Sequence, residues 1–325
     1  MDVFLHTFPL PGVARLAAEA EAEGWDGILL ADSQNLQAEV FVELALAARA
    51  TDRLRLGTGV TNPLTRHPAV TASAAATLQA ESGGRIVLGV GRGDSAVTFI
   101  GESPAPVGAL EDFLRRLQAY LRGEVVELAG FASRLEWLPG DHPKVPVDVA
   151  GAGQRTIQAG AREADAVTFA VGADADRIQW AVETARDAGA TRFGAYVVAA
   201  AHPDIAVARG LVRANVAIFA RFSRGSLARL RDDDRRVVEE VSRSFETGEH
   251  PHLAAGQPAL VTDEFVDRYA VAGPPERCVE RLRELGELGL ERVVVVGASK
   301  DADPREAVAA RKRFATEVLP ALRDV

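Results

Sequence analysis

Short runs rich in valine, isoleucine and leucine alternate with longer segments rich in alanine, glutamate and arginine from the first residue of this chain onward. In the longer segments the apolar residues recur at helical spacing, whereas the short runs have the length and composition of buried strands. Strands that alternate with helices pair in parallel, because each helix returns the chain to the same end of the sheet. The alternation therefore predicts an α/β fold with a parallel sheet.

Eight strands can be counted along the sequence. The predicted strands are residues 3–8, 26–31, 54–61, 85–91, 145–150, 166–171, 192–199 and 292–297. The clearest predicted helices are residues 12–23, 39–50, 68–81, 108–122, 275–288 and 304–322. Two segments, at about 123–144 and 201–271, interrupt the alternation and are expected to be irregular insertions, the larger one carrying a lid or an interface.

Eight strands with intervening helices favour a closed (β/α)8 barrel, or TIM barrel, over an open doubly wound sheet. An open sheet of that kind usually carries a glycine fingerprint on its first strand-to-helix turn. Here the first turn reads FPLPG at residues 8–12 and lacks the fingerprint. We expect residues 1–325 to form one barrel domain with its largest insertion between strands seven and eight, since barrels of about 250 residues or more often form a single domain.

Composition limits the classes of partner. The formal net charge is −9 and the arginines are interspersed with acidic residues, which argues against a nucleic-acid or anionic-membrane partner. No apolar run approaches the roughly 18 residues that a membrane-spanning helix needs. Cys278 is the only cysteine, and a reducing compartment suits a chain without disulfides. We therefore expect a cytoplasmic protein that binds a small-molecule substrate.

The histidines do not follow a metal-binding spacing. The first strand contains no His-x-His, and the chain contains no His-Glu-x-x-His. A metal site is not expected, and metal-dependent hydrolysis is only a minor alternative on this fold. His6, on the first strand, either points into the mouth of the barrel or is a core histidine with a hydrogen-bond partner.

Polar residues follow several of the predicted strands. In a parallel barrel the active site lies at the C-terminal ends of the strands, so these residues are read together. Asp32 and Ser33 follow strand two, Thr61 and Asn62 follow strand three, and Gly93 and Asp94 follow strand four. A carboxylate at a partly closed strand end can act as an acid or as a hydrogen-bonding group. The alternative for Asp94 is capping of the next helix, and for Asp32 the start of a loop.

The turn after strand five is a candidate phosphate site. It contains two glycines, which let the backbone approach a ligand closely, and it leads into a helix whose free N–H groups would point at an anion. Arg155 adds positive charge. The alternative is a tight turn that uses glycine for its dihedral angles. This 151–156 turn consists of Gly151, Ala152, Gly153, Gln154, Arg155 and Thr156.

Four segments resemble the bacterial luciferase-like superfamily, and within it the methylenetetrahydromethanopterin reductase branch. They are residues 24–32 (GWDGILLAD), 53–68 (RLRLGTGVTNPLTRHP), 82–96 (SGGRIVLGVGRGDSA) and 269–276 (YAVAGPPE). The match spans nearly the whole chain, and its combined motifs are specific for the superfamily but much less so for the substrate.

The resemblance implies a TIM barrel, often dimeric, that uses either the deazaflavin coenzyme F420 for hydride transfer or reduced FMN for monooxygenation. It also implies a bulge with a non-prolyl cis peptide, here at Gly59 and Val60, against which the cofactor ring lies. The 151–156 turn aligns with the phosphate-binding turn, and Asp94 and Asp32 match acidic positions. The expected cofactor-binding residues are Gly59, Val60, Thr61, Asn62, Gly93, Gly151, Ala152, Gly153, Gln154, Arg155 and Thr156, and the expected catalytic residues are Asp94, Asp32 and Ser33.

Two residues depart from the family pattern. Many deazaflavin members have Asp-His after strand two, whereas this chain has Asp32-Ser33, and the reductases tend to have a glutamate near the end of strand one, where this chain has His6. Both changes are compatible with the cofactor site, but the resemblance does not extend to a pterin substrate.

The leading hypothesis is therefore an F420-dependent reductase or dehydrogenase. The alternatives are an FMN-dependent monooxygenase supplied by a separate flavin reductase, and a non-catalytic flavin-binding barrel. A deazaflavin lacks the ring nitrogen at position five and does not readily form the oxygen adduct of a flavin, so oxygen consumption separates the two enzymes.

Overall fold

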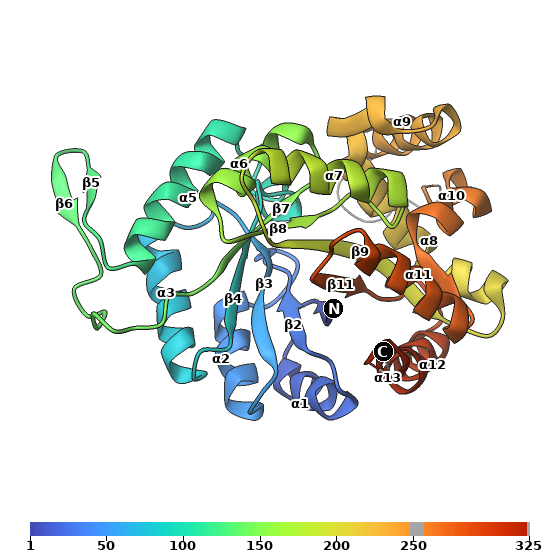
Figure 1. Ribbon diagram of the computed structural model, residues 1–325, viewed down its shortest axis with the longest axis horizontal. Coiled ribbons are helices and arrows are strands. Elements are labelled where there is room, and N and C mark those ends of the chain that lie inside the picture. The colour runs from blue at the N-terminus through green and yellow to red at the C-terminus, as the bar shows by residue number, and fades with distance from the viewer. Residues whose placement is uncertain (248–256, 324–325) are drawn as a thin grey trace.

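The computed structural model describes residues 1–247 and 257–323 and contains a closed ring of eight parallel strands (Figure 1). In ring order the strands are β1 (Asp2–Thr7), β2 (Gly27–Leu30), β3 (Arg55–Thr61), β4 (Ile86–Val90), β7 (Val147–Gly151), β8 (Ala166–Phe169), β9 (Phe193–Ala201) and β11 (Arg292–Val296). The ring closes because β9 pairs with β8 on one side and with β11 on the other. The predicted (β/α)8 barrel is confirmed, and each strand lies within two residues of its predicted bounds.

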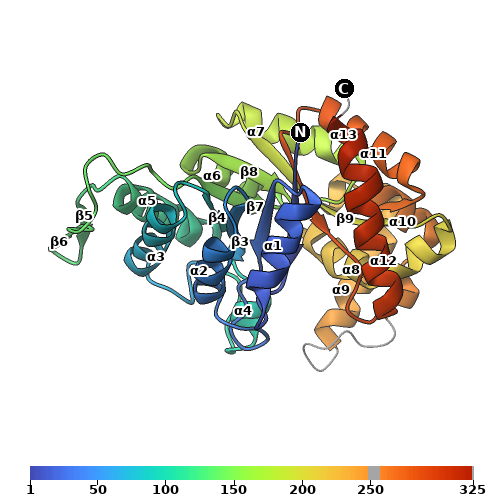
Figure 2. The same ribbon diagram turned by 90° about the horizontal axis from the view of Figure 1, so that it is seen from below.

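Helices surround this ring (Figure 2). They include α1 (Val13–Glu23), α2 (Val40–Ala50), α3 (Pro68–Glu81), α5 (Val107–Leu121), α6 (Gln154–Glu163), α7 (Ala175–Asp187), α11 (Pro275–Glu287) and α12 (Pro304–Arg313), with a short α4 (Ser95–Thr98) after β4. The start of α3 shows why the sequence fixes such boundaries. Pro68 occupies the first turn of α3, and the His67 ring accepts a hydrogen bond from the N–H of Ala69. The N-terminal end of the helix is therefore capped by adjacent residues.

The predicted last helix, residues 304–322, is divided in the structure. After α12 comes a π-helical segment, η3 (Phe314–Val318), and then α13 (Leu319–Arg323). Phe314 stacks on Trp25 with 5.4 Å between ring centroids, which fixes this segment against the end of α1.

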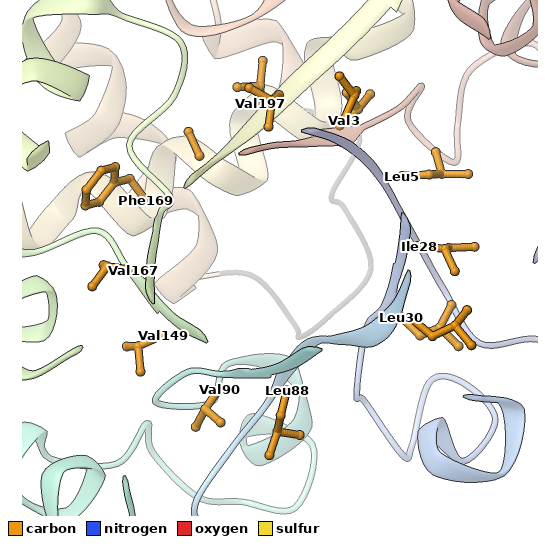
Figure 3. Close-up of a cluster of buried hydrophobic side chains, with 14 of the residues drawn as sticks. Val3, Leu5, Ile28, Leu30, Leu88, Val90, Val149, Val167, Phe169 and Val197 are labelled. Atoms are coloured by element: carbon orange, nitrogen blue, oxygen red, sulfur yellow. The ribbon is translucent and has the colours of Figure 1, made fainter. Parts of the chain in front are cut away.

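The apolar core has two layers, because alternate residues of each strand point to opposite faces. Outward-pointing side chains pack against the helices, and Figure 3 shows them around the ring. Inward-pointing side chains such as Phe4, Leu29 and Tyr196 fill the barrel itself. Both faces are buried, which explains why the strands read as nearly continuous apolar runs.

The N-terminal end of the barrel is closed by a buried ion pair. Arg292 of β11 donates to Asp148 of β7 at 2.9 Å, and the Thr168 hydroxyl donates to the same carboxylate oxygen at 2.6 Å. The Arg292 guanidinium also lies over the Phe4 ring, 5.0 Å from its centroid. This end is therefore filled with side chains, which leaves the opposite end for ligands.

The 123–144 segment is not wholly irregular, contrary to the sequence-based expectation. It contains an antiparallel hairpin of β5 (Val126–Leu128) and β6 (Phe131–Ser133), which projects beyond α3 and α5 (Figure 1). Its two turn residues, Ala129 and Gly130, have φ values of 49° and 86°, as a tight hairpin turn requires. An alanine rarely adopts a positive φ, so the sequence did not mark the turn.

The described part of the 201–271 insertion is more regular than the single helical stretch that its sequence indicated. This part contains α8 (Ile205–Phe222), η1 (Ser223–Arg229), α9 (Asp232–Thr247), η2 (Pro258–Leu260), α10 (Asp263–Tyr269) and a short strand, β10 (Val271–Gly273). Strand β10 pairs with the end of β9, at Ala199–Ala201. Residues 248–256 of the insertion lie outside the described chain. Across the described helices, none is long and apolar enough to cross a membrane.

The ion pair at the closed end gives a stability prediction. We expect Arg292→Met to lower the free energy of unfolding by about 3–5 kcal/mol, because it leaves the Asp148 carboxylate buried without its cation. Adding Asp148→Asn should recover part of this loss, since the uncompensated charge is then removed. Urea unfolding measures both effects.

The control is Arg134→Ala, which breaks an exposed pair with Glu136 and should leave the unfolding midpoint unchanged. If Arg292→Met and Arg134→Ala had the same midpoint, the buried pair would not have the assigned role.

Candidate functional site

The predicted site residues lie on one side of the open end of the barrel. We call the loops that follow the strands the C-terminal rim. Strands β2, β3, β4 and β7 are consecutive in the ring, so the segments that follow them are neighbours on this rim. The structure thus brings together the four sequence segments that contain the expected catalytic and cofactor-binding residues.

Asp32 follows β2 and is buried, with 2% of its side chain exposed. Its Oδ2 atom accepts a hydrogen bond from the Thr61 hydroxyl at 2.7 Å and pairs with the Arg66 guanidinium. A second nitrogen of Arg66 contacts Glu39, which caps the start of α2. Within the described chain, Oδ1 of Asp32 has no hydrogen-bond partner. Two donors therefore fix this carboxylate and leave one oxygen available to a ligand.

Burial raises the pKa of the Asp32 carboxyl, although the Arg66 charge and the Thr61 hydrogen bond act in the opposite direction. Removing a carboxylate from water disfavours its charged form, and here that effect is larger than the stabilisation by the partners. Asp32 can therefore hold a proton closer to neutral pH than an ordinary aspartate can.

Ser33 connects the β2 loop to the segment after β4. Its hydroxyl forms a hydrogen bond with the hydroxyl of Ser95, and the neighbouring Gln34 amide donates to the carbonyl of Ala96 at 2.7 Å. Ser95 directly follows Asp94. These two bonds hold Ser33 beside Asp94 and fix the short helix α4 on the rim.

Asp94 occupies the position before α4, but its side chain forms no capping hydrogen bond. Its Oδ2 atom instead pairs with Arg221, near the end of α8, and 37% of its side chain is exposed. The helix-capping alternative for Asp94 is therefore wrong in this structure. Sequence analysis did not identify Arg221, because a contact over 127 residues leaves no local pattern.

Strand β3 contains the expected bulge. Its pairing with β4 shifts register between Thr58 and Thr61, and the Gly59–Val60 peptide bond is cis. A Cβ atom at Gly59 would lie 2.8 Å from Cβ of Leu29 and 3.0 Å from the His6 ring. Only glycine fits at this close approach inside the barrel.

His6 supports the bulge from inside the barrel. Its Nε2 atom lies 2.8 Å from the Gly59 carbonyl oxygen. A carbonyl can only accept, so this nitrogen carries the hydrogen. Burial lowers the pKa of His6, against the opposing effect of the Gly59 hydrogen bond, and favours the neutral ring. The ring also makes edge contacts with Phe8 and Tyr196, each at 5.9 Å between centroids. Both interpretations of His6 therefore apply in part, because the side chain points into the barrel and has a hydrogen-bond partner.

Asn62 and Gly93 shape the rim. Asn62 Oδ1 accepts the N–H groups of Leu64 and Thr65, both at 3.0 Å, and its Nδ2 donates to the Thr65 hydroxyl. Gly93, with φ of 90°, has the Asn62 Cβ 3.4 Å from where its own Cβ would lie. The Asn62 side chain is occupied by its own loop, and direct ligand contact by either residue stays a prediction.

The 151–156 turn ends β7 and begins α6. Gly153 is the residue before the helix and provides no side-chain cap. The first N–H to bond within the helix is that of Ile157, which donates to the Gly153 carbonyl at 3.0 Å. In the described chain the three preceding N–H groups have no acceptor, as expected at a helix start. They belong to Gln154, Arg155 and Thr156.

The side of this turn is formed by η1 of the insertion. A Cβ atom at Gly153 would lie 3.4 Å from the carbonyl oxygen of Gly225. Arg155 is exposed and, so far as the described residues show, makes no ion pair. The turn therefore presents N–H donors and a guanidinium beside a glycine-lined surface, which is the chemistry of an anion site.

Arg177 of α7 holds η1 in place, and this role was not predicted from the sequence. Its side chain is buried and donates to the Val171 carbonyl at 2.5 Å and to the Ser226 hydroxyl at 3.1 Å. Tyr269, whose ring lies under the guanidinium, donates to the carbonyl of Phe219 at 3.0 Å. These contacts hold η1 next to the 151–156 turn.

Metal ligands do not gather at this rim. Among residues 1–247 and 257–323, no group of three or more histidine, cysteine, aspartate or glutamate side chains is arranged to hold a metal ion.

Comparisons with known proteins agree with this architecture. The family described as luciferase-like monooxygenase matches residues 4–292. A 5,10-methylenetetrahydromethanopterin reductase of Methanolobus tindarius is 27% identical over 92% of this chain and 94% of its own. An F420-dependent glucose-6-phosphate dehydrogenase of Beutenbergia cavernae is 29% identical over 86% of this chain and 82% of its own. The solved coenzyme F420-dependent tetrahydromethanopterin reductase of Methanopyrus kandleri has a TM-score of 0.81 at 22% identity, with 99% of each chain covered.

The raised pKa of Asp32 predicts the pH dependence of stability. Between the unfolded and the folded pKa the folded protein binds more protons at this site, so its stability falls as pH rises through that interval. Asp32→Asn cannot titrate. We therefore expect the stability of this variant relative to the unmodified protein to increase as pH rises above about 4, the ordinary pKa of an aspartate, as measured by urea unfolding across pH.

Asp165→Asn is the control with the opposite sign. Burial acts to raise the pKa of Asp165, but Lys144, the Val147 N–H and Gln118 together lower it. This variant should be less stable than the unmodified protein at neutral pH, with a deficit that shrinks in acid. If both variants changed in the same direction with pH, the assigned environment of Asp32 would be wrong.

Proposed function

Because the chain belongs to the luciferase-like monooxygenase family, we propose that it is an F420-dependent oxidoreductase that transfers a hydride between the deazaflavin and a small organic substrate. The proposal rests on one structural observation. Four consecutive strand ends present the 151–156 turn on one side and Asp32, Ser33 and Asp94 on the other. The F420-dependent and reductase relatives reported above support the choice of cofactor.

The residues present fit a phosphate-bearing cofactor. The N–H groups at the start of α6 are donors, and the Arg155 guanidinium adds a positive charge. Gly153 leaves open the place that a larger side chain would fill beside Gly225. At the other side of the site, the Gly59–Val60 bulge offers a wall without a polar side chain, suited to the flat face of a ring.

When bound, F420 supplies a ring carbon that accepts or donates a hydride. The chain's own residues bind and orient. Thr61 and Arg66 hold one oxygen of Asp32, so its other oxygen can accept a hydrogen bond or hold a proton at the rim. Ser33 and Asp94 provide a hydroxyl and a carboxylate from the adjacent loops. Acid–base groups placed in this way assist proton movements that accompany hydride transfer.

The test is a parallel titration of the purified protein with F420 and with FMN, each oxidised and reduced, followed by fluorescence. Tighter binding of F420, with hydride transfer to or from candidate substrates, is the expected result. Preference for reduced FMN with oxygen consumption would overturn the proposal in favour of a monooxygenase. Tight binding without turnover across the substrate panel would instead identify a flavin-binding barrel.

Gly153→Val tests the phosphate position. The added side chain would enter the space between the start of α6 and Gly225, so we expect F420 binding to weaken by about tenfold or more, equivalent to ~1.4 kcal/mol. Gly140→Val is the matched control, because Gly140 is exposed and a Cβ there meets nothing within 4 Å. Equal affinity of the two variants would place the phosphate elsewhere.

We further propose that the protein forms a homodimer through α2 and α3. These neighbouring helices expose apolar side chains to solvent: Val42 (58% exposed) and Leu46 (50%) on α2, and Val70 (58%) on α3. Leu64, in the loop before α3, is also exposed. A group of exposed apolar side chains on adjacent helices is typical of a protein–protein interface.

Leu46→Glu combined with Val70→Glu tests the dimer. Two carboxylates in an apolar contact would carry a high desolvation cost, so we expect the double variant to be monomeric by light scattering while the unmodified protein is dimeric. Phe131→Glu, which changes an equally apolar exposed residue on the β5–β6 hairpin, should leave the mass unchanged. A dimer that survives the double change would exclude this interface.

Two remaining features depend on the choice of cofactor and compartment. A separate flavin reductase is required only if reduced FMN proves to be the cofactor. A cytoplasmic location is part of the proposal and is supported by Cys278, a single buried thiol suited to a reducing compartment. Cell fractionation with an antibody to the protein tests that location.

A further inference from the structure

The loop after β11 is joined to the middle of α8 through Ser299. The Ser299 N–H donates to the Leu211 carbonyl at 2.7 Å, and the Ser299 hydroxyl accepts from the Asn215 N–H at 2.9 Å. Leu211 and Asn215 are the acceptor and donor that one rung of a regular helix would join. Ser299 is buried and lies at that rung. A side chain inserted at a rung affects the direction of the helix beyond it.

Asn215 provides a second contact between the same two elements. Its side-chain amide donates to the Gly297 carbonyl at 2.9 Å. The loop after β11 and the middle of α8 are thus connected by three hydrogen bonds, of which two use polar side chains. This connection fixes α8 relative to the barrel ring, because Gly297 directly follows β11.

The part of α8 beyond this connection places Arg221 at the C-terminal rim. Arg221 follows Asn215 by six residues, or about 9 Å of helix. It pairs with Asp94, which follows β4. Since β4 and β9 are separated in the ring by β7 and β8, the pair connects the helix after β9 to a distant part of the rim. The place where α8 ends decides whether this contact can form.

We propose that Arg221 is a positioning residue for Asp94, and that Ser299 and Asn215 place Arg221 by fixing α8 to the loop after β11. The inference rests on the proposed function, in which Asp94 contacts the cofactor or the substrate. Arg221 holds Oδ2 of Asp94 and so orients the carboxylate, which is partly exposed and has its Oδ1 directed to no partner in the described chain. The orientation of this carboxylate then depends on the insertion as well as on β4, the strand that precedes Asp94.

The first test compares kcat and KM of Arg221→Gln with those of the unmodified protein. Glutamine removes the positive charge and the guanidinium group that holds Asp94. We therefore expect kcat to fall between about 10-fold and 100-fold, as for a misplaced catalytic group. KM for F420 should change little, because the 151–156 turn is intact. Arg221→Lys, which retains the charge, should recover part of kcat. Unchanged kcat in Arg221→Gln would overturn the proposal.

The second test asks whether Ser299 and Asn215 act through Arg221. Ser299→Ala and Asn215→Ala should each lower kcat, and neither should lower it further in an Arg221→Gln background. If Ser299→Ala lowered kcat by the same factor with and without Arg221, Ser299 would act on the site by another route and this part of the proposal would be wrong. Ser82→Ala is the matched control. Its buried hydroxyl also accepts a backbone N–H, from Arg85 at 3.2 Å, but it lies before β4, at the closed end of the barrel.

A third measurement requires no ligand and separates failure of this inference from failure of the proposed function. The thermal unfolding midpoint is measured for Ser299→Ala, Arg221→Gln and the double variant. If Ser299 places Arg221, the double variant should lose less than the sum of the two single shifts. Coupled midpoints in a protein that does not bind F420 would uphold the positioning and reject the proposed function. Additive midpoints would reject the positioning whatever the cofactor.

Discussion

Closure of the parallel ring is the constraint on which the rest of this structure depends. Strand β9 pairs with both β8 and β11, so the sheet has no free edge within the ring and all eight strands run in the same direction. Every loop that follows a strand must therefore lie at one end of the barrel. The opposite end is filled by Asp148, Arg292 and the side chains around them. Residues as distant in sequence as Asp32 and Gly153 lie on the same rim only because of this closure.

Inside the ring, regular strand pairing is interrupted at the β3 bulge. Strand β3 shifts register against β4 near Gly59, where no side chain could be accommodated beside Leu29 and His6. His6 then donates a hydrogen bond to the displaced Gly59 carbonyl. A local departure from strand geometry that is supported by a specific buried partner is what is expected at a functional site rather than in a structural core. The bulge lies between the loops that carry Asp32 and Asp94, which connects it to the proposed ring position.

Local patterns predicted the barrel and the four rim segments, because strand and helix periodicity depends on nearby residues. The same patterns could not predict the β5–β6 hairpin, since Ala129 adopts a positive φ that alanine seldom takes. Nor could they predict the partners of the acidic residues. Arg66 lies in the loop after the third predicted strand, but its contact with Asp32 depends on how adjacent loops fold. The Arg221–Asp94 pair depends on an insertion whose path no local signal describes. Long-range pairs of charged side chains are set by tertiary structure alone.

The central claim is that the rim formed by β2, β3, β4 and β7 holds a deazaflavin in one orientation. The most direct measurement is a crystal structure of the protein grown with F420. We expect a phosphate within hydrogen-bond distance of the N–H groups of Gln154, Arg155 and Thr156, and a ring that lies against Gly59–Val60 with Asp32 and Asp94 nearby. A cofactor bound outside this rim, or with its phosphate and ring ends exchanged, would contradict it.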